Sequence, residues 1–168
     1  MNDPRSTTAS AVDVDAVVVG AGFGGLYAVY KLRELGFSAR LFERGSDVGG
    51  TWYWNRYPGA RCDAPSMQYS YSFSAELQQE WVWSELYASQ PEILRYLQHV
   101  ADRFDLRPMM QFDTSVEQAI YDEASRTWRV TTDRGETVTA RFCILATGCL
   151  SSQNTPNFPG LDDYTGVW

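Results

Sequence analysis

The sequence predicts an α/β fold with a central parallel sheet, helical crossovers and an antiparallel β-meander. Residues 16–20 and 141–146 are short apolar runs, typical of buried parallel strands. Residues 26–35 carry apolar side chains at a helical period, and Gly36 is placed to end that helix. The meander is predicted from three alternating segments separated by turn residues, namely 115–121, 127–132 and 136–140.

The remaining elements are predicted from less regular sequence patterns. Residues 38–43 read as a second parallel strand, which completes a βαβ unit with the first strand and helix. Residues 44–65 fit no period, but they alternate glycine and proline with aromatic residues, which predicts an ordered functional loop. Four more elements are expected: short strands over 68–73 and 110–113, a helix over 76–87, and an amphipathic helix over 91–106 that is capped by Ser89.

Composition excludes several classes of protein. Aromatic residues make up 14% of the 168 residues, which argues against a disordered chain. The net charge of −7 argues against a nucleic-acid partner, and no apolar run approaches the roughly 18 residues of a membrane span. Cys62, Cys143 and Cys149 lack the spacing of a disulfide framework or a metal site. A reducing cytoplasm is the simplest location.

Length and composition together predict one main domain with two flanking segments. A length of 168 residues suggests about one domain. We expect residues 1–15 to form a flexible tail, because they are polar and rich in serine and threonine. Residues 16–149 would form the ligand-binding domain, and residues 150–168, rich in Ser, Pro, Asn and Gly, would form a connector.

A glycine motif follows the first strand. Gly20, Gly22 and Gly25 fit the pattern G-x-G-x-x-G between a strand and a helix. The first glycine permits the tight turn, the second lets a pyrophosphate approach the backbone, and the third lets helix and strand pack closely. Glu43 ends the second strand, where an acid accepts the ribose hydroxyls of a dinucleotide. The alternative is a glycine-rich turn without a ligand and a solvated glutamate.

The acid narrows the choice of dinucleotide. A carboxylate at Glu43 suits a free 2′-hydroxyl and repels a 2′-phosphate, so the site favours FAD or NAD over NADP. Arg44 could instead contact a 2′-phosphate, or it could be a solvated surface residue. The glycines alone do not decide between FAD and NAD.

The loop that follows carries a resemblance to a known family. Residues 49–63, GGTWYWNRYPGARCD, resemble the flavin loop of Baeyer–Villiger monooxygenases, within the flavin-containing monooxygenases. The likeness covers essentially the whole chain from Asp15 onward, and it continues through residues 69–73, 87–96, 146–148 and 157–161. It implies a Rossmann-like FAD-binding domain.

The resemblance also implies roles for individual residues. Asp63 would be the catalytic residue, supporting the arginine of the active site and the reactive flavin intermediate. On spacing alone Asp63 could equally be a loop cap before Pro65, and Trp52 and Trp54 could simply cover the core. The cofactor-binding set would comprise Gly20, Gly22, Phe23, Gly25, Glu43, Arg44, Gly49, Gly50, Thr51, Trp52, Asp63, Tyr69, Val116, Ala146, Thr147 and Gly148.

The family has parts that this sequence lacks. A second G-x-G-x-x-G for NADPH, a linking signature with His and Trp, and an active-site arginine would all lie beyond Trp168. We therefore expect an N-terminal fragment that is inactive alone and belongs with the remainder of its own chain. The parent would use NADPH and O₂ to convert a small-molecule ketone to an ester or lactone through a C4a-peroxyflavin.

Three alternatives remain open at this point. One is a flavin-containing monooxygenase that oxidises nitrogen or sulfur, like N,N-dimethylaniline monooxygenase. The second is a non-catalytic dinucleotide-binding module, because a fold does not fix a function. The third is an NAD-dependent dehydrogenase, although a plain NAD site does not require the loop at 49–63.

Overall fold

The computed structural model describes residues 12–152 and 154–166, and its fold is α/β, as predicted. Residues 1–11, which belong to the expected tail, lie outside the described residues. So do residues 153, 167 and 168 of the expected connector. The elements in chain order are β1 Val14–Val19, α1 Phe23–Glu34, β2 Ala39–Phe42, α2 Thr51–Trp54, α3 Ala75–Glu80, α4 Gln90–Arg103, the 3₁₀ turn η1 Arg107–Met109, β3 Met110–Gln111, β4 Val116–Asp122, β5 Thr127–Thr132 and β6 Thr137–Leu145.

Six strands among the described residues form one mixed sheet in the order β3-β2-β1-β6-β5-β4. β1 pairs in parallel with both β2 and β6, and β2 pairs in parallel with β3. The meander β4-β5-β6 is antiparallel. The parallel half therefore contains the βαβ unit β1-α1-β2, and the carboxyl ends of β1, β2 and β6 meet at one edge.

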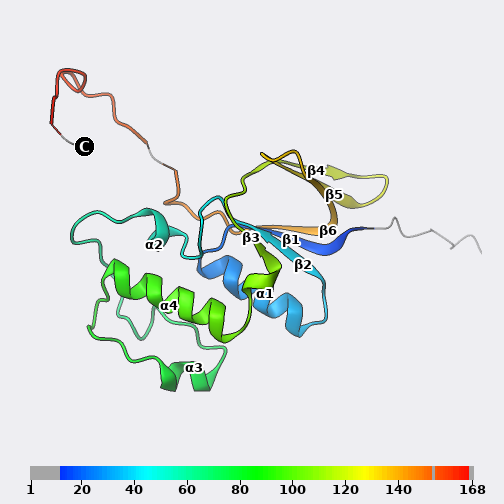
Figure 1. Cartoon of the computed structure of the whole chain (residues 1–168), viewed down its shortest axis with the longest axis horizontal. Coiled ribbons are helices and arrows are strands. Elements are labelled where there is room, and N and C mark those ends of the chain that lie inside the picture. Colours follow the sequence, from blue (N-terminus) through cyan, green and yellow to red (C-terminus); the bar gives the residue numbers. More distant parts are fainter. Residues whose placement is uncertain (1–11, 153, 167–168) are drawn as a thin grey trace, which may run out of the picture.

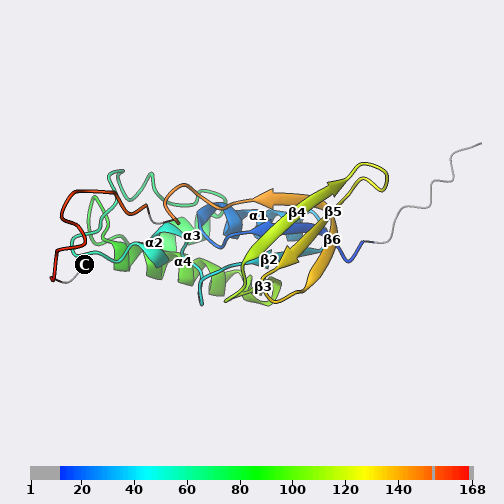
Figure 2. The ribbon, with the colours of Figure 1, turned by 90° about the horizontal axis from the view of Figure 1, so that it is seen from above.

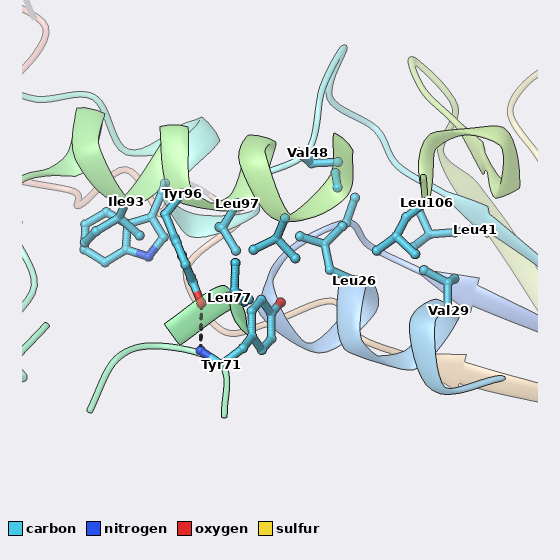
Figure 3. Packing of buried hydrophobic residues seen from close by; sticks show 14 of the residues in the cluster. Leu26, Val29, Leu41, Val48, Tyr71, Leu77, Ile93, Tyr96, Leu97 and Leu106 are labelled. Carbon is cyan, nitrogen blue, oxygen red and sulfur yellow. Dashed lines mark hydrogen bonds between the residues drawn. The ribbon is translucent and has the colours of Figure 1, made fainter. Parts of the chain in front are cut away.

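Two apolar clusters hold the layers together. Helices α1, α3 and α4 lie on one side of the sheet, and the β4–β5 hairpin curls over the other (Figures 1 and 2). The larger cluster, between helices and sheet, includes the fully buried Leu26, Leu41 and Leu97 (Figure 3). The smaller cluster joins Val17 and Phe42 to side chains of the meander. Both faces of β1 are thus buried at residues 16–18, which explains the continuous apolar sequence from Ala16 onward.

Several predicted boundaries need correction. β1 begins at Val14, so residues 14 and 15 are part of the sheet rather than of a tail. The Asp13 carboxylate before them accepts the Thr139 backbone N–H at 2.7 Å, which ties Asp13 to β6. The strands expected at 136–140 and 141–146 are a single strand, β6. No turn residue separates them, and β6 pairs with β5 through its first half and with β1 mainly through its second.

The segment between α2 and α4 differs most from expectation. The strand expected over 68–73 is absent, because the Tyr71 N–H is donated to the Tyr96 phenol oxygen at 2.9 Å rather than to a neighbouring strand. The helix expected over 76–87 ends at Glu80. Beyond it the Ser84 N–H and hydroxyl both bond the Glu92 carboxylate at 2.8 Å, which holds the backbone away from a helical path.

The two longer helices follow their predicted patterns with shifted ends. α1 begins at Phe23, within the glycine motif, and Gly36 follows it at φ +78°, as a glycine after a helix does. α4 ends at Arg103, three residues early, because Asp105 adopts φ +48°. Ser89 is its N-cap by position, but the Ser89 side chain makes no capping hydrogen bond.

Among the residues that the structure describes, no helix combines the length and the apolar composition that a bilayer crossing requires.

Candidate functional site

A cleft of about 430 Å³ opens at the edge of the sheet where β1, β2 and β6 end. In α/β sheets with this strand arrangement, ligands bind outside the carboxyl ends of the strands. Its lining comprises Val19, Gly20, Gly22, Phe23, Gly24, Phe42, Glu43, Arg44, Gly49, Gly50, Thr51, Trp52, Trp54, Tyr69, Thr114, Ser115, Val116, Ala146, Thr147, Gly148, Ser151 and Ser152.

The first wall of the cleft is the glycine turn, residues 20–25. The Gly20 N–H is donated to Phe42 O at 2.8 Å, so the turn is pinned to β2. Gly22 is the N-cap of α1 and offers no side chain to its first-turn amides. These amides have no partner within a helix and carry the positive end of its dipole. This wall therefore presents N–H donors where a phosphate could bind.

Gly25 lies behind this wall rather than in it. A Cβ atom at Gly25 would overlap the carbonyl oxygen of Gly20, and Leu41 Cδ1 would be 3.3 Å away. The third glycine therefore lets α1 pack against β1, and it does not line the cleft.

Glu43 connects the two sides of the cleft. Its side chain is buried, with 6% exposed, and it lines the cleft at the end of β2. One carboxylate oxygen accepts the Ala21 N–H and the other accepts the Gly45 N–H, each at 2.7 Å. Such charge-assisted bonds fix the carboxylate, and a carboxylate retains further lone pairs for ligand hydroxyls.

The second wall is the loop of residues 44–54. The Gly49 N–H is donated to Ala21 O at 2.9 Å, which brings this loop against the glycine turn. The two backbones touch at Gly50, where a Cβ would lie 2.7 Å from Gly22 Cα. Trp52, within this loop, is largely buried, and its indole N–H is donated to the Tyr69 hydroxyl at 3.1 Å.

Asp47 anchors this second wall to the helical layer. Its carboxylate accepts hydrogen bonds from Arg107 at 2.7 Å and from Gln98 at 2.8 Å, and it also accepts the Val48 N–H. Partial burial acts to raise the pKa of Asp47, but these hydrogen bonds outweigh it and hold the pKa below its ordinary value. An ionised carboxylate therefore ties the loop to α4 and η1.

The turn between β3 and β4 closes a third side that the sequence reasoning did not identify in full. Thr114 and Ser115 line the cleft beside the predicted Val116. Thr114 is almost fully buried, and its N–H is donated to Glu43 O at 2.9 Å. Their position in the sequence could have identified them, because they directly follow a predicted strand, and parallel strands of one sheet end at the same edge.

The mouth of the cleft is lined by Arg44 and by the segment after β6. The Arg44 guanidinium lies over the Trp54 ring at 4.6 Å and donates to Ser151 O at 2.7 Å. The Ser151 hydroxyl in turn donates to Thr147 O at 3.1 Å. The sequence reasoning did not include Ser151 and Ser152 and left Trp54 as a loop aromatic, yet all three line the cleft.

The structure brings together all the predicted cofactor-binding residues except Gly25 and Asp63. Asp63 is exposed and is not among the lining residues. Burial raises the pKa of the Tyr69 phenol, and the Asp63 charge adds to this effect, so the two residues are neighbours. A catalytic role for Asp63 stays a prediction.

Residues 17–167 match the pyridine nucleotide-disulphide oxidoreductase family, and the chain belongs to that family. It is 52% identical to a Baeyer-Villiger monooxygenase of Pseudooceanicola batsensis, over 98% of this chain and 31% of the relative. It is 48% identical to the phenazine N-monooxygenase PhzNO1 of Lysobacter antibioticus, over 92% of this chain and 30% of the relative.

Solved structures of this group share the fold. The crystal structure of the OTEMO complex with FAD and NADP is 47% identical in sequence and superimposes with a TM-score of 0.86. That match covers 93% of this chain and 30% of the OTEMO chain. The present chain thus spans about 30% of the length of these relatives.

Proposed function

We propose that this chain is the FAD-binding portion of an NADPH- and O₂-dependent flavoprotein monooxygenase that converts ketones to esters or lactones. The observation that carries the proposal is the cleft itself, where helix amides, a buried carboxylate and a close glycine contact converge. NADPH, O₂ and a small-molecule ketone would meet the flavin in the longer protein, beside the remainder of the chain.

The residues present fit an FAD molecule in this cleft. The N-terminus of α1 would hold the pyrophosphate, and Glu43 would accept the ribose hydroxyls. A Cβ on either Gly22 or Gly50 would narrow the gap between the walls, where it would lie 3.4 Å or less from the opposite backbone. When bound, the flavin supplies the redox chemistry, and the protein supplies position and exclusion of water.

Arg44 bears on the choice of dinucleotide. Its guanidinium is already engaged with the Trp54 ring and with Ser151 O. Glu43 faces the place where a 2′-phosphate would lie, and like charges repel. Both features favour FAD over NADP in this cleft.

Oxidation of nitrogen is the second candidate function. A relative named phenazine N-monooxygenase is 48% identical over 92% of this chain, nearly as similar as the Baeyer-Villiger relative. The cleft described here would hold the same flavin for either reaction. Residues outside this chain would then select between a ketone and a nitrogen heterocycle.

The first experiment tests cofactor choice. The purified chain is titrated with FAD, NAD⁺ and NADP⁺, and binding is followed by flavin fluorescence and by calorimetry. We expect saturable binding of FAD and weaker binding of the other two. Glu43→Gln should weaken FAD binding, whereas Glu117→Gln, on the exposed face of β4, should leave it unchanged. Equal affinity for NAD⁺ and FAD would contradict the proposal.

The second experiment tests the reaction. The chain replaces the matching third of the Pseudooceanicola enzyme, and ketone-dependent NADPH oxidation and ester formation are measured. We expect the chimera to retain activity, and the 168-residue chain alone to have none. A chimera that binds FAD but oxidises no ketone would contradict the proposal.

A further inference from the structure

A continuous series of aromatic rings leads from the cleft to the two tryptophans that follow α3. We call these rings the aromatic series; in order from the cleft they are Trp52, Tyr69, Phe23, Tyr71, Tyr96, Trp83 and Trp81. It starts at the cleft lining, where the Trp52 and Tyr69 rings have centroids 5.9 Å apart. Phe23, also in the lining, is 4.8 Å from Tyr69.

The series then crosses the core beneath the cleft. Phe23 is 5.1 Å from Tyr71 and 6.2 Å from Tyr96, and these two tyrosines are 6.0 Å apart. Tyr71 and Tyr96 lie side by side, joined by the bond from the Tyr71 N–H to the Tyr96 hydroxyl (Figure 3). Tyr96 is in turn 4.9 Å from Trp83 and 5.2 Å from Trp81, both of which are half-buried.

Tyrosine and tryptophan are the side chains that lose an electron most readily, and rings in contact pass electrons faster than aliphatic side chains do. Burial raises the pKa of both Tyr71 and Tyr96, so they keep their protons. The Tyr71 hydroxyl is donated to the carbonyl of Phe23 at 2.6 Å, and a carbonyl is a poor proton acceptor. Tryptophan can lose an electron without losing a proton, so the indoles at the two ends are the better resting places for a charge.

We propose that the aromatic series carries single electrons from Trp81 and Trp83 to a photoexcited flavin, the one-electron oxidant, in the cleft. The inference rests on the proposed function, which puts a flavin there. One electron leaves the indole of Trp83 or Trp81, passes Tyr96, Tyr71 and Phe23, and refills Trp52 or Tyr69. Trp52 or Tyr69 has by then given one electron to the oxidant. The oxidant gains one electron, and the outer indole is left as a radical cation.

This path would move an oxidising equivalent away from the cleft to a place where soluble reductants can reach it. Aromatic packing at 4.5–7 Å also occurs in cores that carry no charge, so the test follows the electron itself.

The test excites the flavin of the FAD-loaded chain with a blue flash and records transient absorption and light-induced electron paramagnetic resonance. The photoexcited flavin is the oxidant. We expect fast quenching of flavin fluorescence by Trp52 and Tyr69, followed by a long-lived tryptophan radical. The W81F/W83F variant should keep the fast quenching and lose the long-lived radical. W128F, which alters a tryptophan on β5 that contacts Tyr121, should change neither signal.

The outcomes separate the two proposals. Failure to bind FAD overturns the proposed function, and the conduction path with it. FAD that binds while the long-lived radical persists in W81F/W83F overturns the conduction path alone. So does a radical yield that rises with the concentration of free FAD, because it reports collisions at the surface. Circular dichroism of each variant shows whether the fold is kept, and Phe at both positions preserves the ring packing.

Discussion

The glycine turn at 20–25 and the loop at 44–54 face each other across one cleft, but they are held in place differently. The turn is fixed by its own backbone, through the tight packing of Gly25 on Gly20 and the N–H bond to β2. The loop is fixed by distant side chains, chiefly the Asp47 contacts to Arg107 and Gln98. One wall is therefore specified by local sequence, and the other by tertiary contacts.

The difference appears again in how the walls can fail. A substitution at Gly25 must disturb the packing of α1 on β1, which belong to the core of the sheet. A substitution that frees the loop can leave the sheet intact and still deform the cleft. Stability and cofactor affinity should therefore change together for the first wall and separately for the second.

The largest effect is expected from Gly25→Ala. The added Cβ would overlap a backbone carbonyl, so α1 must move away from β1. We expect the free energy of unfolding to fall by more than ~3 kcal/mol, at the upper end of overpacking effects. Urea denaturation followed by circular dichroism measures it.

Its matched control is the neighbouring glycine. Gly24 lies in the same helix, and a Cβ there meets Ala146 Cβ at an ordinary 3.7 Å. Gly24→Ala should raise stability by about 0.5–1 kcal/mol, because alanine is the better helix former. Similar losses in both variants would show that the turn is sensitive to any side chain rather than to the contact at Gly25.

A smaller effect is expected from Gly50→Ala, where the two walls touch. Gly50 adopts φ +52°, and a Cβ there would lie 2.7 Å from Gly22 Cα. We expect a loss of about 2–3 kcal/mol from backbone strain and crowding together, with FAD affinity reduced by at least as much. Thermal unfolding and FAD titration measure the two quantities.

Gly59 provides the comparison for Gly50→Ala. Gly59 has φ +81°, but no atom lies within 4 Å of a Cβ there. Gly59→Ala should therefore show only the strain of a positive φ, about 1 kcal/mol, and should leave FAD binding unchanged. If Gly50→Ala behaves like Gly59→Ala, the contact between the walls does not shape the cleft.

The same division between local and tertiary control explains what the sequence could reveal. The strand, glycine turn and helix over 16–36 carry their signals within a few residues, and their prediction is confirmed. The segments at 68–73 and 81–87 were predicted wrongly, because their backbones bond to Tyr96 and Glu92 on α4. No local pattern contains those partners.

The residues of the cleft divide in the same way, into those that local spacing reveals and those that it does not. Gly20, Gly22 and Glu43 could be placed from spacing alone, whereas residues 49–52 were located through a resemblance. Thr114 and Ser115 were missed, because they join the cleft only when β3 pairs with β2.

The smallest effect concerns Asp47 and its dependence on pH. Because the folded pKa lies below the ordinary value of 3.8, Asp47 adds stability above that value and loses this contribution as pH falls through the folded pKa. Asp47→Asn removes the charge that faces Arg107. We expect a loss of about 1 kcal/mol at pH 7 and a shallower decline of stability below about pH 4 than in the unaltered chain.

A variant at Asp122 tests whether the role of Asp47 in holding the loop differs from a general sensitivity of the fold to acid. Hydrogen bonds from Ser125 lower the pKa of Asp122 too, but Asp122 lies at the end of β4, outside the cleft lining. Asp122→Asn should also flatten the acid limb of the stability curve, yet leave FAD affinity at pH 7 unchanged. Asp47→Asn should lower that affinity, because the loop at 44–54 loses its tie to η1. Unfolding curves from pH 3 to 7 measure the stability, and FAD titrations at pH 7 measure the affinity. If both variants leave FAD affinity intact, the second wall keeps its shape without Asp47, and the glycine contact at Gly50 becomes its main support.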